Sequence, residues 1–326
     1  MNMSIVSYEY TIEEIYFYTV NVFAVMANFI LLCLILKKNR VVQGDYVILM
    51  AAFSVSQIAY SISTSIVLPK TQSFPSGIID FSTEERLNNH GIFSFIMIVA
   101  YLDTFNSTVI LLSTLFMYRS SIVNDYTSFI KPRSQLIKSI NYFLLSHLLL
   151  NGQMMLFYPT AEDSLVTYHV LQFHGINASQ SPYISALLWY TDENDDIVYN
   201  YWRILGISFG MAYFTVIVFT MLQCGYKIRR KLKEHYFSPQ VKAVQKQILK
   251  VLFIQMLISI MTTLIPIILA FVMILLDLDP LCMSSRTRIM NVLHPLLDAV
   301  TAIYFMHGFK KPTSFMILGR PCIGIH

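Results

Sequence analysis

An apolar stretch of the chain, residues 91–118, contains three polar side chains whose spacing allows them to act together. Asp103, Asn106 and Ser107 stand at positions i, i+3 and i+4, so a helix places all three on one face. An ionised Asp103 would pair with a cationic ligand, and a protonated one would donate a hydrogen bond to a polar ligand. The alternative is that Asp103 bonds to a neighbouring helix and only holds the bundle together. These three residues are our candidate ligand-binding face.

A second candidate site combines a proline with a carboxylate in the last apolar stretch, residues 289–306. Pro295 removes a backbone hydrogen bond and permits a kink in a helix. Asp298 follows one turn later, where its carboxylate can bond toward neighbouring helices. His294, beside the proline, is interpreted as a packed core histidine.

The composition places these residues in a membrane. Of 326 residues, 55% are hydrophobic and only 13% are charged, against roughly 25% charged in soluble domains. A helix of about 20 apolar residues crosses a hydrocarbon core of about 30 Å. We expect an all-α membrane protein, a seven-transmembrane helix bundle (15–309) between an outer tail (1–14) and an inner tail (310–326). The seven expected spans are roughly 15–36, 46–67, 91–118, 136–157, 201–224, 248–275 and 289–306.

The placement of Lys and Arg predicts the orientation of the bundle. Of the 23 basic residues, 18 fall on one side of the seven spans and five on the other. Cytoplasmic loops carry the excess of Lys and Arg. We therefore expect the amino terminus outside and the carboxyl terminus in the cytoplasm. The net charge of +4 reflects this inner face and does not indicate nucleic acid binding.

Motifs for enzyme chemistry are absent from the sequence. The eight histidines show no paired metal-binding spacing, and there is no Gly-rich phosphate loop or nucleophile elbow. We expect no enzyme activity, no cofactor and no metal site.

The outer connection at roughly 158–200 is long, acidic and aromatic, and it has no obvious secondary structure. It contains a glycosylation sequon at Asn177. No cysteine occurs between residues 91 and 200, so a disulfide from the third span to this connection cannot form. Cys322, in the inner tail, is either an acylation site or an unmodified thiol.

Three sequence patterns resemble those of a known receptor family. Residues 44–60 match G-x-Y-x-x-L-M-x-x-F-S followed by a tyrosine, and residues 224–226 and 244–255 match C-G-Y and a Q-K-Q motif with a later glutamine. With Pro295 and Asp298, these patterns resemble the Str group of nematode seven-transmembrane chemoreceptors over about residues 15–312. The sequence departs from the family pattern at Ser259, Ala299 and His307.

The resemblance implies a chemosensory, olfactory G protein-coupled receptor that binds small odorant ligands inside the bundle. It implies a switch role for Pro295 and Asp298. Arg119, Arg230 and Lys231 would then contact a heterotrimeric G protein, although orientation in the lipid bilayer alone explains positive charge at this side. The resemblance also implies a multi-pass protein of the plasma membrane, in the cilium of a chemosensory neuron. The alternatives are a seven-span ligand-gated cation channel and a secondary transporter.

Overall fold

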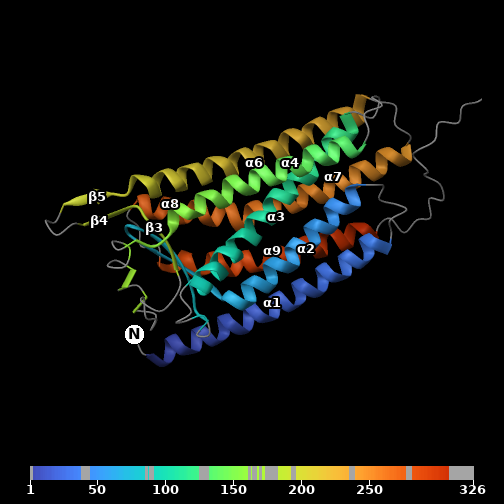
Figure 1. The fold of residues 1–326 in the computed structure, drawn as a ribbon. Coiled ribbons are helices and arrows are strands. Elements are labelled where there is room, and N and C mark those ends of the chain that lie inside the picture. Colours follow the sequence, from blue (N-terminus) through green and yellow to red (C-terminus); the bar gives the residue numbers. More distant parts are fainter. Residues whose placement is uncertain are drawn as a thin grey trace, which may run out of the picture.

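Seven long helical segments lie side by side along a common axis and alternate in direction (Figure 1). This architecture confirms the expected all-α membrane bundle. The segments are α1 (Met3–Lys37), α2 (Tyr46–Val67), α3 (Ile92–Asn124), α4 (Pro132–Met154), α6 (Tyr201–Glu234), α7 (Pro239–Ser259) continued by α8 (Ile265–Leu275), and α9 (Leu281–His307). The computed structural model describes residues 3–37, 45–84, 87, 92–124, 132–160, 163, 167–168, 171–172, 183–191, 196–234, 239–276 and 281–307.

Five of these segments are long and apolar enough to cross a membrane by length and composition. The other two, α4 and α9, are diluted by polar residues such as Asn151 and Asp298. Large apolar side chains point outward from the bundle, among them Leu148 at 70% exposed and Phe219 at 58% exposed. Lipid tails would cover such a surface. The orientation of the bundle stays a prediction.

The sixth span is continuous but irregular. A π-helical turn, Ile260–Leu264, separates α7 from α8. Pro266 explains this turn, because proline has no N–H to donate and its ring crowds the carbonyl one turn earlier. The expected span at roughly 248–275 is therefore present, with a widened turn near its centre.

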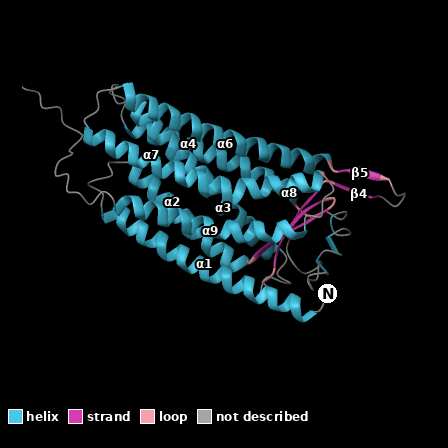
Figure 2. Cartoon of the chain, turned by 180° about the vertical axis from the view of Figure 1, so that it is seen from behind, coloured by secondary structure: helices cyan, strands magenta, loops and turns pink. Residues whose placement is uncertain are grey.

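Strands cover the end of the bundle that carries the amino terminus (Figure 2). β1 (Pro69–Phe74) and β2 (Gly77–Ser82) form a hairpin between α2 and α3, and β3 (Tyr183–Leu187) pairs antiparallel with β2. A Cβ on Gly77 would lie 2.5 Å from the carbonyl oxygen of Ala186, so glycine permits this close strand approach. The sheet joins the connection between α2 and α3 to the connection between α4 and α6.

The connection between α4 and α6 therefore has secondary structure that the sequence analysis did not expect. It contains β3 and a further antiparallel pair, β4 (Trp189–Thr191) with β5 (Ile197–Tyr199). The sequon at Asn177 lies outside the described residues.

A buried ion pair attaches this connection to α6. Arg203 contacts the Asp163 carboxylate at 2.5 Å, and the two side chains are 2% and 0% exposed. Arg203 also donates to the carbonyl of Tyr158 at 2.8 Å and to the carbonyl of Ser185. The Ser185 hydroxyl donates to the other Asp163 oxygen at 2.9 Å. The cluster therefore attaches this connection to the bundle without a disulfide. The sequence has no cysteine between residues 91 and 200 that could form one.

This cluster predicts a large cost for removing its charge on one side only. Arg203→Leu leaves the Asp163 carboxylate buried and unpaired, which costs about 3–5 kcal/mol in comparable cases. We expect a markedly lower midpoint in thermal unfolding of the detergent-solubilised chain. Arg230→Leu is the matched control, because it breaks an exposed Arg–Glu pair and should change the midpoint little. Equal effects of the two substitutions would contradict this attachment.

Candidate functional site

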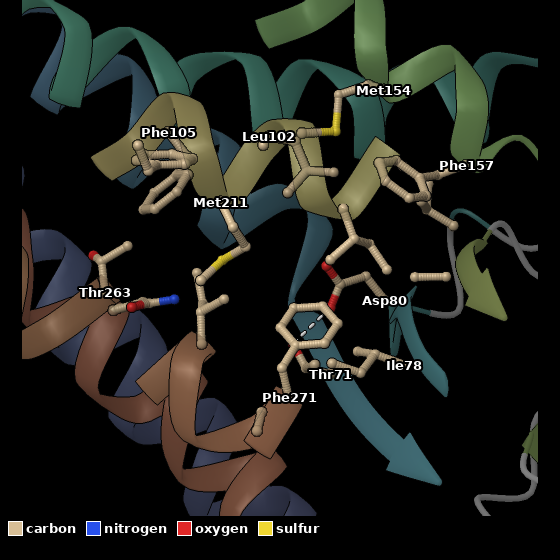
Figure 3. Close-up of a pocket in the computed structure, with 18 of the residues that line it drawn as sticks. Thr71, Ile78, Asp80, Leu102, Phe105, Met154, Phe157, Met211, Thr263 and Phe271 are labelled. Atoms are coloured by element: carbon tan, nitrogen blue, oxygen red, sulfur yellow. Dashed lines mark hydrogen bonds between the residues drawn. The ribbon is translucent and has the colours of Figure 1, made fainter. Parts of the chain in front are cut away.

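A cavity of about 220 Å³ lies directly beneath the strands, inside the bundle. Its walls come from α3, the end of α4, α6, the α7–α8 segment and α9, and residues of β1, β2 and β3 close it from above. Figure 3 shows apolar side chains of several helices turned toward one another around it. They include Leu102, Phe105, Met211 and Phe271. A concave, mostly apolar site with few polar groups is the usual form of a small-molecule binding site.

An ion pair joins the sheet to α9 at the edge of this cavity. Arg288 pairs with the Asp80 carboxylate of β2, and its side chain is 9% exposed. The Arg288 Nε donates to the Thr71 hydroxyl, and one terminal nitrogen donates to the Tyr101 hydroxyl. Thr71 in turn donates to Asp80 Oδ1 at 2.6 Å. Three elements, β1, β2 and α3, therefore converge on one guanidinium of α9.

Three further polar side chains line the cavity. The Gln153 Oε1, Thr263 Oγ1 and Asn291 Oδ1 atoms are buried and have no hydrogen-bond partner among the described residues. Buried polar atoms normally have partners, and each exception calls for an explanation. A bound molecule with polar groups of its own would supply such partners.

The predicted ligand face of α3 lies elsewhere, against α4. Asn151 donates to Asp103 Oδ1, and His147 Nε2 is 3.1 Å from the same oxygen. Asn106 donates to the side-chain oxygen Oδ1 of Asn151 at 3.2 Å, and the Ser107 hydroxyl lies 3.3 Å from His147 Nδ1. None of the three predicted residues is among those that line the cavity. These contacts support the alternative of helix-to-helix bonding, and ligand contact by this face stays a prediction.

Pro295 and Asp298 lie in a polar cluster at the centre of the bundle. The Asp298 carboxylate accepts a hydrogen bond from Gln57 of α2 at 2.9 Å and lies 3.2 Å from His294 Nε2. Gln255 of α7 reaches the Asp298 carbonyl at 3.5 Å. The carbonyl of Pro295 accepts a bond from Asn28 of α1 at 3.1 Å. The predicted pair thus connects α9 to three other helices.

His294 has a polar role that the sequence analysis did not expect. Its Nε2 atom lies 2.9 Å from the Ser259 hydroxyl, and the side chain is 1% exposed. Ser259 stands where the family pattern has a proline, and it therefore adds a hydrogen-bonding group to the cluster.

The predicted coupling residues lie at the end of the bundle opposite the strands. Arg119 is 8% exposed, and its guanidinium stacks 3.5 Å from the ring centroid of Tyr46. Arg230 and Lys231 are different, because they line an open hollow with Lys227 between the ends of α3 and α6. Arg230 also pairs with Glu234 at 2.6 Å.

The motifs at residues 44–60 and 244–255, about 200 positions apart in the chain, come together in the structure. A cavity of about 50 Å³ lies between α2 and α7, near Arg119. Its lining includes Tyr46, Phe53 and Ser54 of the first motif and Leu252 and Gln255 of the second. The motifs therefore describe one contact region of the bundle.

Sequence reasoning missed Asp80 and Arg288 as site residues. It placed Arg288 among the outer basic residues and gave Asp80 no role. A signal was present, because Pro75-Ser76-Gly77 between two runs with β-branched or aromatic residues is typical of a hairpin turn. A hairpin there would have brought Asp80 over the bundle.

Comparison with known proteins identifies relatives over most of the chain. Residues 13–314 match the family described as serpentine type 7TM GPCR chemoreceptor Str. The chain is also 25% identical over 296 residues to serpentine receptor class r-10 of Caenorhabditis briggsae, an alignment that covers 86% of this chain and 84% of that protein.

The contacts between α3 and α4 predict energetic coupling between Asp103 and Asn151. We expect Asp103→Ala and Asn151→Ala each to lower the thermal midpoint of the solubilised chain. The double variant should lose less than the sum, because each change removes the same bond, worth about 1 kcal/mol between membrane helices. Additive losses, together with a specific loss of ligand response in Asp103→Ala, would instead favour ligand contact.

Proposed function

Because the chain belongs to the Str family of serpentine seven-transmembrane chemoreceptors, we propose that it is an olfactory receptor that activates a heterotrimeric G protein. In this proposal a small odorant binds in the cavity beneath β1, β2 and β3. The observation that carries the proposal is the position of α9. This helix contributes Arg288 to the cavity and Asp298 to the central polar cluster.

The separation of Arg288 and Asp298 along α9 would allow a movement of the helix at one residue to reach the other. They are ten positions apart on one helix, which corresponds to about 15 Å along its axis. A ligand that changes how α9 meets the sheet would shift the helix at Asp298 as well. There it contacts Gln57 of α2 and Gln255 of α7. The kink permitted by Pro295 lies between the two sites.

The G protein would bind at the opposite end of the bundle. Arg230 and Lys231 offer exposed positive charge beside the end of α3. Arg119 is held under Tyr46, next to the small cavity where α2 and α7 meet. A movement of α7 would change the environment of Arg119. In this proposal Arg119 is a positioning residue in the coupling of the receptor to the G protein.

The family and the helical spans make the chain a multi-pass membrane protein. We propose that its amino terminus faces outward and that it resides in the ciliary membrane of a chemosensory neuron. The distribution of basic residues supports this orientation. The same orientation opposes the alternative of a ligand-gated channel of the insect odorant-receptor type, in which the amino terminus lies inside.

Calcium imaging of cultured cells tests the proposal. Cells that express the chain with an outer epitope tag would be exposed to an odorant panel, with and without a promiscuous Gα subunit. We expect responses that require the Gα subunit. Ala270→Leu, which fills the cavity from α8, should abolish them while surface staining remains. An inward cation current that ignores the Gα subunit would contradict the receptor and favour a channel.

The proposed movement of α9 makes a separate prediction for Asp298. Asp298→Asn keeps the shape of the side chain but replaces one of its two acceptor oxygens with an NH2 group, which changes its hydrogen bonding with Gln57 and His294. We expect ligand binding to persist within about threefold, while the maximal Gα-dependent response falls by about tenfold or more. Binding to the purified chain and calcium imaging measure the two quantities. A proportional loss of both would show that Asp298 only stabilises the fold.

A further inference from the structure

The charged groups of the ligand cavity are balanced. Asp80 and Arg288 are the charged residues among the described lining, and they pair with each other. The rest of the wall is largely apolar, so a third charge would enter a region of low dielectric without a counter-ion. A carboxylate ligand would meet the Asp80 charge, and an ammonium ligand would meet the Arg288 charge. The pair therefore disfavours ions of either sign.

The charges of Asp80 and Arg288 cancel, but their hydrogen-bond donors and acceptors are not equally occupied. Each nitrogen of the Arg288 guanidinium already donates to a protein oxygen, on Thr71, Tyr101 or Asp80. Asp80 is more accessible, because its side chain is 22% exposed. Both bonds that it accepts from described residues end on Oδ1. No described residue bonds to its Oδ2 atom, which can therefore accept a hydrogen bond from a ligand.

The other polar atoms of the lining point to the same requirement. Gln153 Oε1 and Asn291 Oδ1 are buried acceptors without a partner among the described residues, and Thr263 Oγ1 accepts as readily as it donates. In Figure 3, Thr263 and Asp80 lie on opposite sides of Met211. A molecule that donates a hydrogen bond would satisfy either residue, whereas one that only accepts would leave Asp80 Oδ2 unpaired.

We propose that the cavity selects neutral, mostly apolar molecules that carry a hydrogen-bond donor, and that the donor binds Asp80 Oδ2. A short-chain alcohol is the simplest ligand of this class. The cavity of about 220 Å³ corresponds to roughly seven waters at about 30 Å³ each, which suits a six-carbon chain. The inference depends on the proposed function in one respect, that this cavity is where the ligand binds.

Binding to the purified full-length chain in detergent tests the ligand class without any G protein. The probes are 1-hexanol, its isomer 1-methoxypentane, which lacks the donor, hexanoate and hexylammonium. We expect 1-hexanol to bind about tenfold more tightly than the ether, because a hydrogen bond to a carboxylate adds that much. The two ions should bind more weakly than the alcohol. An ether that binds as well as the alcohol, or an alcohol that does not bind, overturns the proposal.

Two substitutions should switch the charge preference in opposite directions. Asp80→Asn leaves Arg288 without its counter-ion, so hexanoate should become the preferred probe. Arg288→Gln leaves Asp80 alone, so hexylammonium should become preferred. Lys70→Gln is the control, because Lys70 lies on β1 outside the cavity lining and its loss should keep the alcohol preference. Binding of the newly preferred probe would also show that the variant is folded. If a variant does not fold, the comparison of the four probes on the wild-type chain still tests the proposal.

The proposed function and this inference fail in different ways. If 1-hexanol binds the purified chain but evokes no Gα-dependent response in cells, the signalling proposal fails and the ligand class stands. If cells respond through Gα to ethers or ions as strongly as to alcohols, the ligand class is wrong and the receptor function stands.

Discussion

The ion pair between Arg288 of α9 and Asp80 of β2 is the contact on which the strand-covered end of the bundle depends. It holds the sheet over the bundle, and Thr71 and Tyr101 share the same guanidinium. Breaking one side of a buried pair leaves an uncompensated charge, which is far more costly than losing both charges together. The pair thus closes the cavity and sets its charge in a single interaction.

The remaining polar contacts extend this constraint along α9. Ten positions from Arg288, Asp298 bonds to α2, and the carbonyl of Pro295 bonds to α1. Because these groups are buried, a displacement of α9 must exchange one set of hydrogen bonds for another rather than vary smoothly. The connection between α4 and α6 is fixed independently by Arg203 and Asp163, so the attachment of the sheet to α6 does not depend on α9.

The sequence was sufficient for the family and for an all-α bundle of long helices, because hydropathy and local motifs report on single helices. The family resemblance and the helical bundle are confirmed. The sequence did not predict which distant segments of the chain would contact one another. The Asp103 face was expected to meet either a ligand or a helix, and only the packing of α4 brings Asn151 to it. Asp80 and Arg288 are more than 200 positions apart, and no periodicity links them.

Photoaffinity labelling tests the central claim, that the ligand binds beneath the sheet and not on the face of α3 that packs against α4. The purified chain would be cross-linked with a six-carbon alcohol that carries a diazirine, and the modified residues identified by mass spectrometry. Labelling of Met211 and Phe271, with protection by excess 1-hexanol, is the result that this account predicts. Labelling concentrated at Asp103 and His147, with Met211 and Phe271 unmodified, would contradict it.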